Sequence, residues 1–405
     1  MSRSGEPGTG EPVRVMLLTS SLEAGGAERQ VIELAKALVS GRFDPLVCSL
    51  SPEVPLAASL PDRERRLVVV PKRWRFDVTT IPRVARVMKR ERIRLVQSFL
   101  FDADMVARLA APWGGKAAVI ASERNADYER PRLQSIFLKL TRRYVDALVA
   151  NSRAGQRFTM RTLGMPESDV YVIHNGVDVD RFHPRDRAEA RTALGLPPQG
   201  RVVGMVASFK PQKNHLLFLE VARRVLDRVP DVLFVCAGEV LRGAGTSAFS
   251  LRAGTGAHRN VDDYHRRVGR ALEEHRLGEK VRLLGAVGEV ERVYNACDLT
   301  LLTSLHEGTP NVLLESMASG VPVVATAVSD NAEIVPEGRV GHVVPSGDAA
   351  AMADRAVALL TAEARREALG RAAREWAERE FSTSALARKT GAVYEEVLRR
   401  KAHVR

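Results

Sequence analysis

The chain has 405 residues, a net charge of +12, and 45% hydrophobic against 27% charged residues. This length favours two domains, and the composition is typical of a folded globular protein rather than of a disordered or fibrous one. No apolar run approaches the roughly 18 residues of a membrane-spanning helix. Cys48, Cys236 and Cys297 lack the spacing of a metal site, so we expect buried free thiols in a reducing, cytoplasmic compartment.

Residues 1–12, MSRSGEPGTGEP, are polar and rich in glycine and proline. They lack the apolar stretch of a secretory signal, so this segment is predicted to be a disordered tail.

From residue 13 on, short β-branched runs alternate with segments of helical periodicity. Strands are predicted at 13–20, 43–50, 67–70, 94–99, 117–122, 147–152, 170–178, 201–209, 231–238, 280–287, 298–304, 321–326 and 341–347. Helices are predicted at 25–40, 81–95, 102–113, 131–146, 215–229, 264–277, 290–297, 310–320 and from 349 to the C-terminus. The Gly/Ser/Ala-rich segment 241–263 breaks the rhythm and is predicted to form a surface loop or insertion.

This alternation predicts an α/β protein, in which helices cover both faces of parallel sheets. The segment 177–201 is rich in charge, proline and glycine, as linkers are. We therefore predict two Rossmann-like, doubly wound domains, 13–185 and 186–382. Ligands of such sheets bind beyond the carboxyl ends of the strands, so two facing domains would share a cleft there.

A basic patch lies at residues 63–94, where twelve Lys or Arg face three acidic residues, a local excess of nine positive charges. Ile81 to Leu95 within it has the periodicity of a basic amphipathic helix. Two interpretations stay open: one face packs on the protein's own core and the other meets water, or the patch binds anionic lipid headgroups or an acidic acceptor. No nucleic-acid motif or aromatic platform accompanies the charge, so no nucleic acid is expected.

The stretch HEGTPNVLLESMASG, residues 306–320, places Glu307 and Glu315 eight positions apart around a Thr309-Pro310 step. Threonine caps helices and proline fits their first position, so a helix is predicted to begin at this step. Glu307 would then lie on the preceding loop, and Glu315 one to two turns inside the helix.

A helix start of this kind suits a nucleotide. The N–H groups from Gly308 to Val312 would carry the positive end of the helix dipole, a ready site for a diphosphate. Beside it, the Glu315 carboxylate suits ribose hydroxyls. Glu307 suits sugar hydroxyls or positive charge developing at an anomeric carbon.

The pattern S-x-x-EG-x-PN-x-LLE-x-MA-x-G resembles the donor-site signature of retaining glycosyltransferases of family 4, which have the GT-B fold. Further segments resemble family elements: GGAER (25–29), VIHNGVDVDRF (172–182), VASFKPQKNH (206–215) and GVPVVATAVSDNAEIV (320–335). The resemblance covers residues 13–400. It implies that a C-terminal helix, 383–404, packs back on the N-terminal domain.

The resemblance implies catalytic roles for Glu307 and Lys213, because Lys213 matches the lysine that neutralises the donor diphosphate. From the residues alone, Lys213 could also cap a helix or pair with Glu220. The expected donor contacts are Gly25, Gly26, Ser208, Lys213, Val287, Gly308, Thr309, Pro310, Asn311, Val312 and Glu315.

Two departures from the family pattern concern polar side chains. Ser208 stands where the family has an arginine, and Lys210 is the candidate substitute. Where many members have a catalytic-site histidine, this chain has Glu123, Arg124 and Asn125, which become the expected acceptor-side residues.

The resemblance implies transfer of a sugar, with retention, from a UDP- or GDP-linked donor to a glycan or lipid-linked acceptor, with no tightly bound cofactor and no essential metal. Polysaccharide, glycolipid or other cell-envelope synthesis is the expected setting, at the inner face of the membrane if the basic patch binds lipid. Two alternatives stay open: a sugar-nucleotide epimerase or phosphorylase on the same scaffold, or a non-catalytic, membrane-associated sugar-nucleotide-binding protein.

Overall fold

The computed structural model describes residues 11–23, 25–39, 41–74, 77–124, 131–238 and 259–403. It has two compact units: an N-terminal unit, Met1–Gly176 with Thr383–Arg405, and a C-terminal unit, Val177–Ser382. Most of the predicted tail (1–12), most of the predicted loop (241–263) and all of Asn125 lie outside the described residues.

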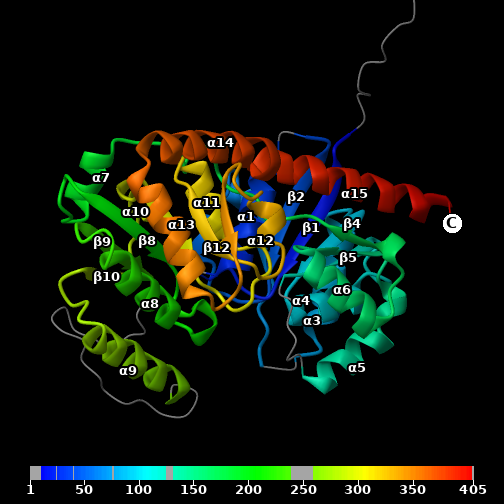
Figure 1. Ribbon diagram of the computed structural model, residues 1–405. Helices are drawn as coiled ribbons and strands as arrows, with labels where there is room; N and C mark the ends of the chain where they lie inside the picture. The colour runs from blue at the N-terminus through cyan, green and yellow to red at the C-terminus, as the bar shows by residue number, and fades with distance from the viewer. Residues whose placement is uncertain are drawn as a thin grey trace, which may run out of the picture. The chain divides into compact units, whose positions relative to one another are not determined.

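The N-terminal unit is built on a seven-stranded sheet in the order β3-β2-β1-β4-β5-β6-β7 (Figure 1). All neighbouring strands are parallel. The strands are β1 (Val13–Thr19), β2 (Phe43–Ser49), β3 (Leu67–Val69), β4 (Leu95–Phe99), β5 (Ala118–Glu123), β6 (Ala147–Ala150) and β7 (Val170–Val172). All seven predicted strands are confirmed, and the reversal of order between β1 and β4 makes the sheet doubly wound.

Helices cover both faces of this sheet because β1 alternates its side chains between two cores. Val15 and Leu17 join a cluster with α1 and α15, whereas Met16 and Leu18 join one with α3 and α4. The helices of the unit are α1 (Gly26–Leu38), α2 (Arg63–Arg66), α3 (Thr80–Arg90), α4 (Phe101–Ala110), α5 (Arg132–Leu140), α6 (Arg153–Leu163) and α15 (Thr383–His403).

The last helix of the chain is anchored to the N-terminal sheet. On α15 the buried Tyr394 hydroxyl donates to Gln97 Oε1 of β4 at 2.5 Å. Its ring packs edge-on against Phe43 of β2. A polar group buried in this way is stabilising only while it keeps its partner.

The C-terminal unit repeats the plan with six parallel strands in the order β10-β9-β8-β11-β12-β13. The strands are β8 (Arg201–Val206), β9 (Val232–Ala237), β10 (Val281–Gly285), β11 (Leu299–Leu302), β12 (Val323–Thr326) and β13 (Gly341–Val344). All six predicted strands are confirmed, so the chain has the two predicted Rossmann-like sheets.

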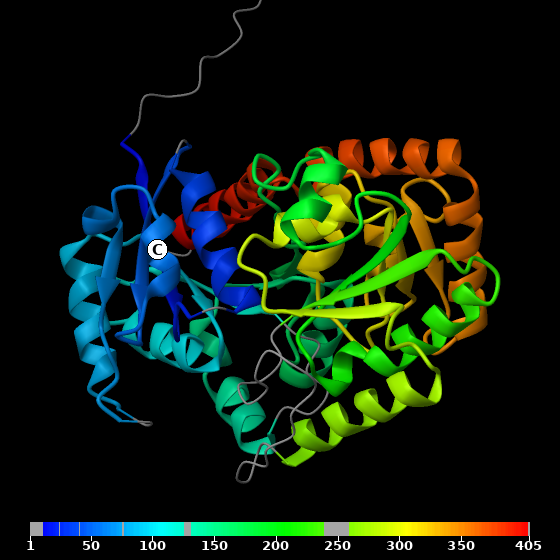
Figure 2. The same ribbon diagram turned by 90° about the vertical axis from the view of Figure 1, so that its left-hand side faces the viewer.

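Helices also cover both faces of the second sheet (Figure 2). α8, α9 and α13 share one core cluster, and α10, α11 and most of α14 share another. The helices are α7 (Arg187–Ala193), α8 (His215–Leu226), α9 (Arg259–Glu274), α10 (Val290–Ala296), α11 (Asn311–Ala318), α12 (Asn331–Ile334), α13 (Ala349–Thr361) and α14 (Glu363–Phe381). The three cysteines are buried and free, as predicted.

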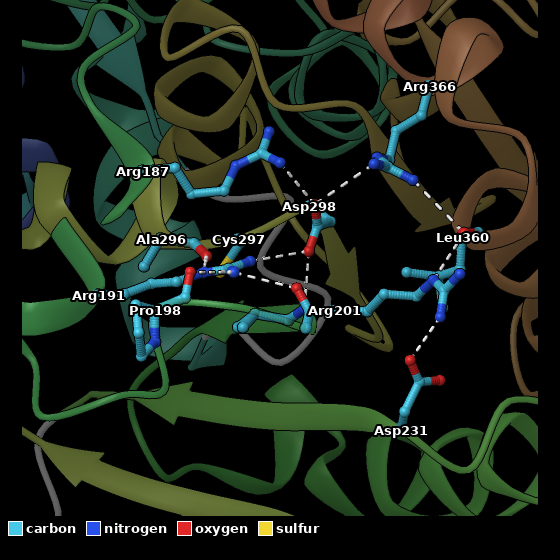
Figure 3. A network of polar contacts seen from close by, with 12 residues as sticks. Arg187, Arg191, Pro198, Arg201, Asp231, Ala296, Cys297, Asp298, Leu360 and Arg366 are labelled. Atoms are coloured by element: carbon cyan, nitrogen blue, oxygen red, sulfur yellow. Dashed lines mark hydrogen bonds and ion pairs between the residues drawn. The ribbon is translucent and has the colours of Figure 1, made fainter. Parts of the chain in front are cut away.

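Asp298, at the amino end of β11, is the centre of a buried ionic network (Figure 3). Its Oδ2 accepts from Val202 N of β8 at 2.8 Å and from Arg191 at 3.0 Å. Its Oδ1 lies 2.8 Å from Arg187 Nη1 and 3.6 Å from Arg366 Nη2. One carboxylate therefore links β8, α7 and α14 at the end of the sheet opposite the carboxyl edge.

The structure departs from the sequence predictions at several helices. The predicted helix 81–95 ends at Arg90, because Arg92 is left-handed (φ 52°) and the chain then enters β4. α6 and α7 were not predicted. Each begins at a side-chain cap: Ser152 accepts from Gly155 N, and Asp186 accepts from Glu189 N.

The basic helix α3 packs one face on its own core, where Val84 and Met88 are fully buried. The predicted core face of this helix is therefore confirmed, and Arg86 and Lys89 on the opposite face are exposed. Several basic side chains of the patch also have acidic partners: Arg66 pairs with Asp44, and Arg83 pairs with the buried Asp77.

Candidate functional site

Two loops at the carboxyl edge of the C-terminal sheet bring Lys213 and Glu307 together. Lys213 ends a short 3-10 turn after β8, and Glu307 lies on the loop between β11 and α11. Lys213 Nζ donates to Glu307 Oε1 at 2.5 Å, and only 19% and 8% of the two side chains are exposed. Glu220, the other partner considered for Lys213, pairs instead with Arg224.

Backbone contacts hold these two loops against each other. Thr303 Oγ1 donates to Lys213 O at 2.8 Å, and Leu305 N donates to Gln212 O at 2.8 Å. The Gln212 amide reaches the other way, to His306 O at 2.7 Å. The positions of Lys213 and Glu307 are therefore set by bonds between adjacent strand–helix loops, and not by their own ion pair alone.

Helix α11 begins one residue later than predicted. Asn311 is its first residue, and Pro310 occupies the N-cap position with an extended backbone (φ −75°, ψ 110°). The prediction that Thr309 caps the helix is wrong, because Thr309 lies outside that position, although it is buried. The predicted core face is confirmed, since Leu314 and Met317 are fully buried.

Glu315, in the second turn of α11, is held by a tyrosine. The Tyr294 hydroxyl of α10 donates to Glu315 Oε2 at 2.6 Å, and only 9% of Glu315 is exposed. A hydrogen bond to a carboxylate is among the stronger neutral–charged contacts, so it fixes the orientation of this side chain. Glu315 thus faces the protein interior and not bulk solvent.

These groups can together receive an anion. The first-turn N–H groups of a helix lack intrahelical acceptors and carry the positive end of the dipole. Gly308 and the following residues lead into that turn, directly after Glu307. Lys213, from the neighbouring loop, adds one positive charge. The arrangement therefore offers a cation, a helix start and two carboxylates within one unit.

Two family models match the chain, one to each half. Residues 186–376 match Glycosyl transferases group 1, and residues 24–181 match Glycosyltransferase Family 4. The chain belongs to glycosyltransferase family 4. The residues that match Glycosyl transferases group 1 include the loops that carry Lys213 and Glu307.

Curated relatives of this family 4 chain include D-inositol 3-phosphate glycosyltransferase 2 of Catenulispora acidiphila, 32% identical over 62% of this chain and 56% of that protein. The lipopolysaccharide core biosynthesis mannosyltransferase LpsB of Rhizobium meliloti is 31% identical over 64% of this chain and 67% of that protein. The chain thus spans little more than half the length of the first curated relatives it matches.

Among solved structures, the Anabaena protein HepE in complex with UDP superposes with a TM-score of 0.80. It covers 95% of this chain and 100% of the HepE chain at 19% sequence identity. At this identity the likeness shows the fold, which is GT-B.

Ser208 and Val287, two further residues predicted to contact the donor, lie at the same edge of the C-terminal sheet. Ser208 follows β8 and is half-buried, whereas Lys210 is exposed and forms no ion pair with a described residue. Val287 is half-buried and follows Gly285, which ends β10 with a positive φ of 69°. A further residue here was missed: a Cβ on Gly238 would lie 1.8 Å from Ala207 O, so only glycine fits that approach.

Gly25 and Gly26 lie in the N-terminal unit, at the start of α1. A Cβ on Gly25 would lie 2.0 Å from Glu28 Oε2, so the Glu28 carboxylate folds back over the helix start. Ser21 Oγ donates to the same carboxylate at 3.3 Å. The expected phosphate contact at this turn would therefore require the Glu28 side chain to move aside.

Glu123 and Arg124, which are predicted acceptor-side residues, follow each other at the carboxyl end of β5. Arg124 Nη2 donates to Asn175 Oδ1 at 2.7 Å, and its guanidinium lies over the Phe99 ring. Burial lowers the pKa of Arg124 to about 10, which leaves it charged at neutral pH. Asn151 donates to Arg124 O, so three segments converge on this arginine.

Several supporting residues were not predicted, because their partners are distant in the chain. Tyr294 holds Glu315, and Gln212 holds the His306 loop. In the N-terminal unit the Gln30 side chain makes two 2.8 Å bonds to the backbone of Gly176. Gln30 could have been recognised from the sequence, because it is a polar residue within the apolar face of a predicted helix.

Proposed function

We propose that this family 4 member transfers a sugar from a nucleotide diphosphate sugar, UDP- or GDP-linked, to an acceptor hydroxyl, with retention at the anomeric carbon. The observation that carries the proposal is the buried Lys213–Glu307 pair beside the start of α11, with Glu315 oriented inside the same helix. It supplies a group for each part of the donor: a lysine for the diphosphate, and carboxylates for the ribose and the sugar.

The ion pair suggests how donor binding prepares the site. When the diphosphate arrives at the start of α11, Lys213 exchanges the Glu307 carboxylate for phosphate oxygens, so its charge stays paired. Glu307 is then left beside the sugar, where it accepts hydroxyls and stabilises positive charge at the anomeric carbon. Glu315 accepts the ribose hydroxyls.

In this proposal, departure of the diphosphate places negative charge beside Lys213 and the backbone N–H groups at the start of α11. Preorganised donors of this kind lower a barrier because they need no reorganisation at the moment of reaction. The acceptor oxygen attacks on the face from which the diphosphate leaves, and the diphosphate takes the acceptor proton. Protein groups neutralise the charge here, so the proposed reaction requires no essential metal, and activity should persist in EDTA.

We assign the donor to the C-terminal domain, 186–382, and the acceptor to the N-terminal domain, 13–185 with helix 383–404. Glu123, Arg124 and Asn125 are the proposed acceptor-side residues. The buried bond from Arg124 to Asn175 supports a fixed guanidinium at this place.

A cell-envelope glycan or lipid-linked acceptor is the proposed acceptor class. It is supported by the name of LpsB, which concerns lipopolysaccharide core biosynthesis, and UDP as carrier is supported by the HepE complex. We propose a cytoplasmic protein, peripheral at the inner face of the membrane, with the patch 63–94 attracted to anionic lipid. Arg86 and Lys89 of α3 remain exposed for this role.

Ligand-dependent melting followed by product analysis tests the proposal. UDP, GDP and ADP are compared first, because only the nucleotide that fits stabilises the folded protein. The matching sugar nucleotide is then incubated with and without acceptor, and products are separated by chromatography. The proposal expects a glycosylated product only with acceptor. A changed donor sugar without acceptor, or no stabilisation by any nucleotide diphosphate, would contradict it.

A further inference from the structure

Helix α5 turns an apolar stripe toward solvent. Leu133, Ile136, Phe137 and Leu140 are 63%, 51%, 44% and 70% exposed, and Leu138 is the buried residue of the helix. Their spacing is i, i+3, i+4 and i+7, which places them along one face. In the described part of the chain, four of the nine large exposed hydrophobic side chains are on this one helix. α5 lies at the periphery of the N-terminal unit (Figure 1).

The charged side chains of α5 and of the turn that follows it, Arg142–Tyr144, are all basic. Arg132, Lys139, Arg142 and Arg143 are all exposed, and the sequence from 131 to 145 has no acidic residue. None of the four forms an ion pair with a described residue, although Arg143 donates to the neighbouring Tyr144 hydroxyl. The basic patch 63–94 differs in this respect, since several of its cations are neutralised by aspartates.

We propose that α5 docks the protein on an anionic lipid surface, with the apolar stripe inserted at the headgroup boundary and the flanking cations among the headgroups. An amphipathic helix with apolar side chains and unpaired Lys/Arg has the chemistry of such an interfacial element. A second copy of the chain fits less well, because a symmetric contact would bring this positive face against itself. In the described part of the chain, no helix has the length and apolar character needed to cross a bilayer.

This docking does not depend on the transfer reaction, so it is measured without substrates. Docking through α5 also differs from purely electrostatic attraction through the patch 63–94, because it adds the burial of apolar side chains. Electrostatic attraction is screened within about 10 Å at 0.1 M salt, whereas burial of apolar side chains is not weakened by salt. Binding through α5 should therefore leave a salt-resistant fraction.

The experiment uses flotation of the full chain with vesicles of phosphatidylcholine containing phosphatidylglycerol, compared with phosphatidylcholine alone. Leu133→Gln/Leu140→Gln is the test variant and Trp113→Gln, at a site 79% exposed outside α5, is the matched control. The wild-type protein and the control should float with the anionic vesicles and keep a bound fraction at high salt. The test variant should lose binding about tenfold or more, because each lost leucine removes apolar contact with the bilayer.

A second variant separates charge from insertion. Lys139→Glu/Arg142→Glu should lower binding to anionic vesicles and leave the small binding to neutral vesicles unchanged. In Phe137→Trp, the fluorescence emission of the introduced tryptophan should shift to shorter wavelength when anionic vesicles are added, because the indole ring leaves water. Wild-type-like flotation of Leu133→Gln/Leu140→Gln would overturn the proposal. So would a change of oligomeric state in that variant by sedimentation, because the stripe would then be a protein interface.

Discussion

Lys213 and Glu307 lie 94 positions apart in the sequence, yet their charged atoms are 2.5 Å apart and largely shielded from water. Each group therefore has a partner of opposite charge within hydrogen-bond distance before any ligand is present. It also means that a cation for the diphosphate is already in place, held by the carboxylate that the sugar is expected to meet.

Removing the lysine should cost both binding and turnover. Lys213→Ala leaves Glu307 buried without its cation, and it removes a charge-assisted bond to the diphosphate, so nucleotide binding should weaken roughly 10- to 100-fold. The rate of transfer should fall roughly 100-fold or more. Calorimetry with the nucleotide and initial rates measure the two effects. Lys213→Arg, which keeps the charge, is the control and should recover part of the binding.

The hydroxyl of Tyr294 should matter for the nucleotide, although it is expected to touch no substrate. Tyr294→Phe removes the hydroxyl that holds Glu315 Oε2, so binding of the ribonucleotide should weaken about 5- to 30-fold. The loss should shrink for the 2′-deoxy nucleotide, which lacks one hydroxyl that Glu315 would accept. Tyr394→Phe, which removes a comparable buried bond to Gln97, should lower stability without this effect. Equal losses for both nucleotides would count against the ribose role of Glu315.

The Asp298 network should be a large contributor to stability of the C-terminal unit. Asp298→Ala leaves Arg191 buried without its carboxylate partner, which should cost about 3–5 kcal/mol of unfolding free energy. Asp231→Asn removes an exposed pair with Arg201 and should cost at most about 1 kcal/mol. Denaturant unfolding measures the free energy of unfolding of both variants. A loss in Asp298→Ala as small as that in Asp231→Asn would contradict a structural role for the network.

His215 should make stability depend on pH. Burial, with the nearby His265 and Lys213, lowers the pKa of His215 from its ordinary value of 6.5 to about 4. Between these values the unfolded chain binds the proton more readily, so stability is complete above pH 6.5 and falls as the pH drops toward 4. The loss should approach roughly 3 kcal/mol at the acid end. Thermal melts of wild type and His215→Asn between pH 4 and 7 test this, since the variant should show a weaker dependence.

The sequence predicted the strands well because each is a short β-branched run bounded by turn residues. All thirteen lie where the pattern placed them, with ends shifted by a few residues. Helices were less predictable. α6 has a weak apolar pattern, RAGQRFTMRTL, and α7 lies in a charged segment whose composition is typical of a linker. The capping residues Ser152 and Asp186 were therefore the only sequence indications of these two helices.

Features that depend on distant residues could not be predicted. The bond of Tyr294 to Glu315 and the ion pair of Lys213 join separate strand–helix units, which no local pattern connects. Periodicity predicted a helix at 131–146, but it cannot tell whether the apolar side chains of that helix face the core or solvent. On α5 it faces solvent, because only Leu138 reaches the core.

The most direct test of the account is to compare Glu307→Gln with wild type in both nucleotide binding and transfer. The glutamine keeps the shape of the side chain but releases Lys213 from its ion pair. Binding of the nucleotide diphosphate should be unchanged or tighter, while the rate of transfer falls roughly 100-fold or more. Two results would contradict the account, in which Lys213 leaves Glu307 to bind the diphosphate. One is that the affinity for the nucleotide falls as much as the rate of transfer, and the other is that the variant transfers sugar at the wild-type rate.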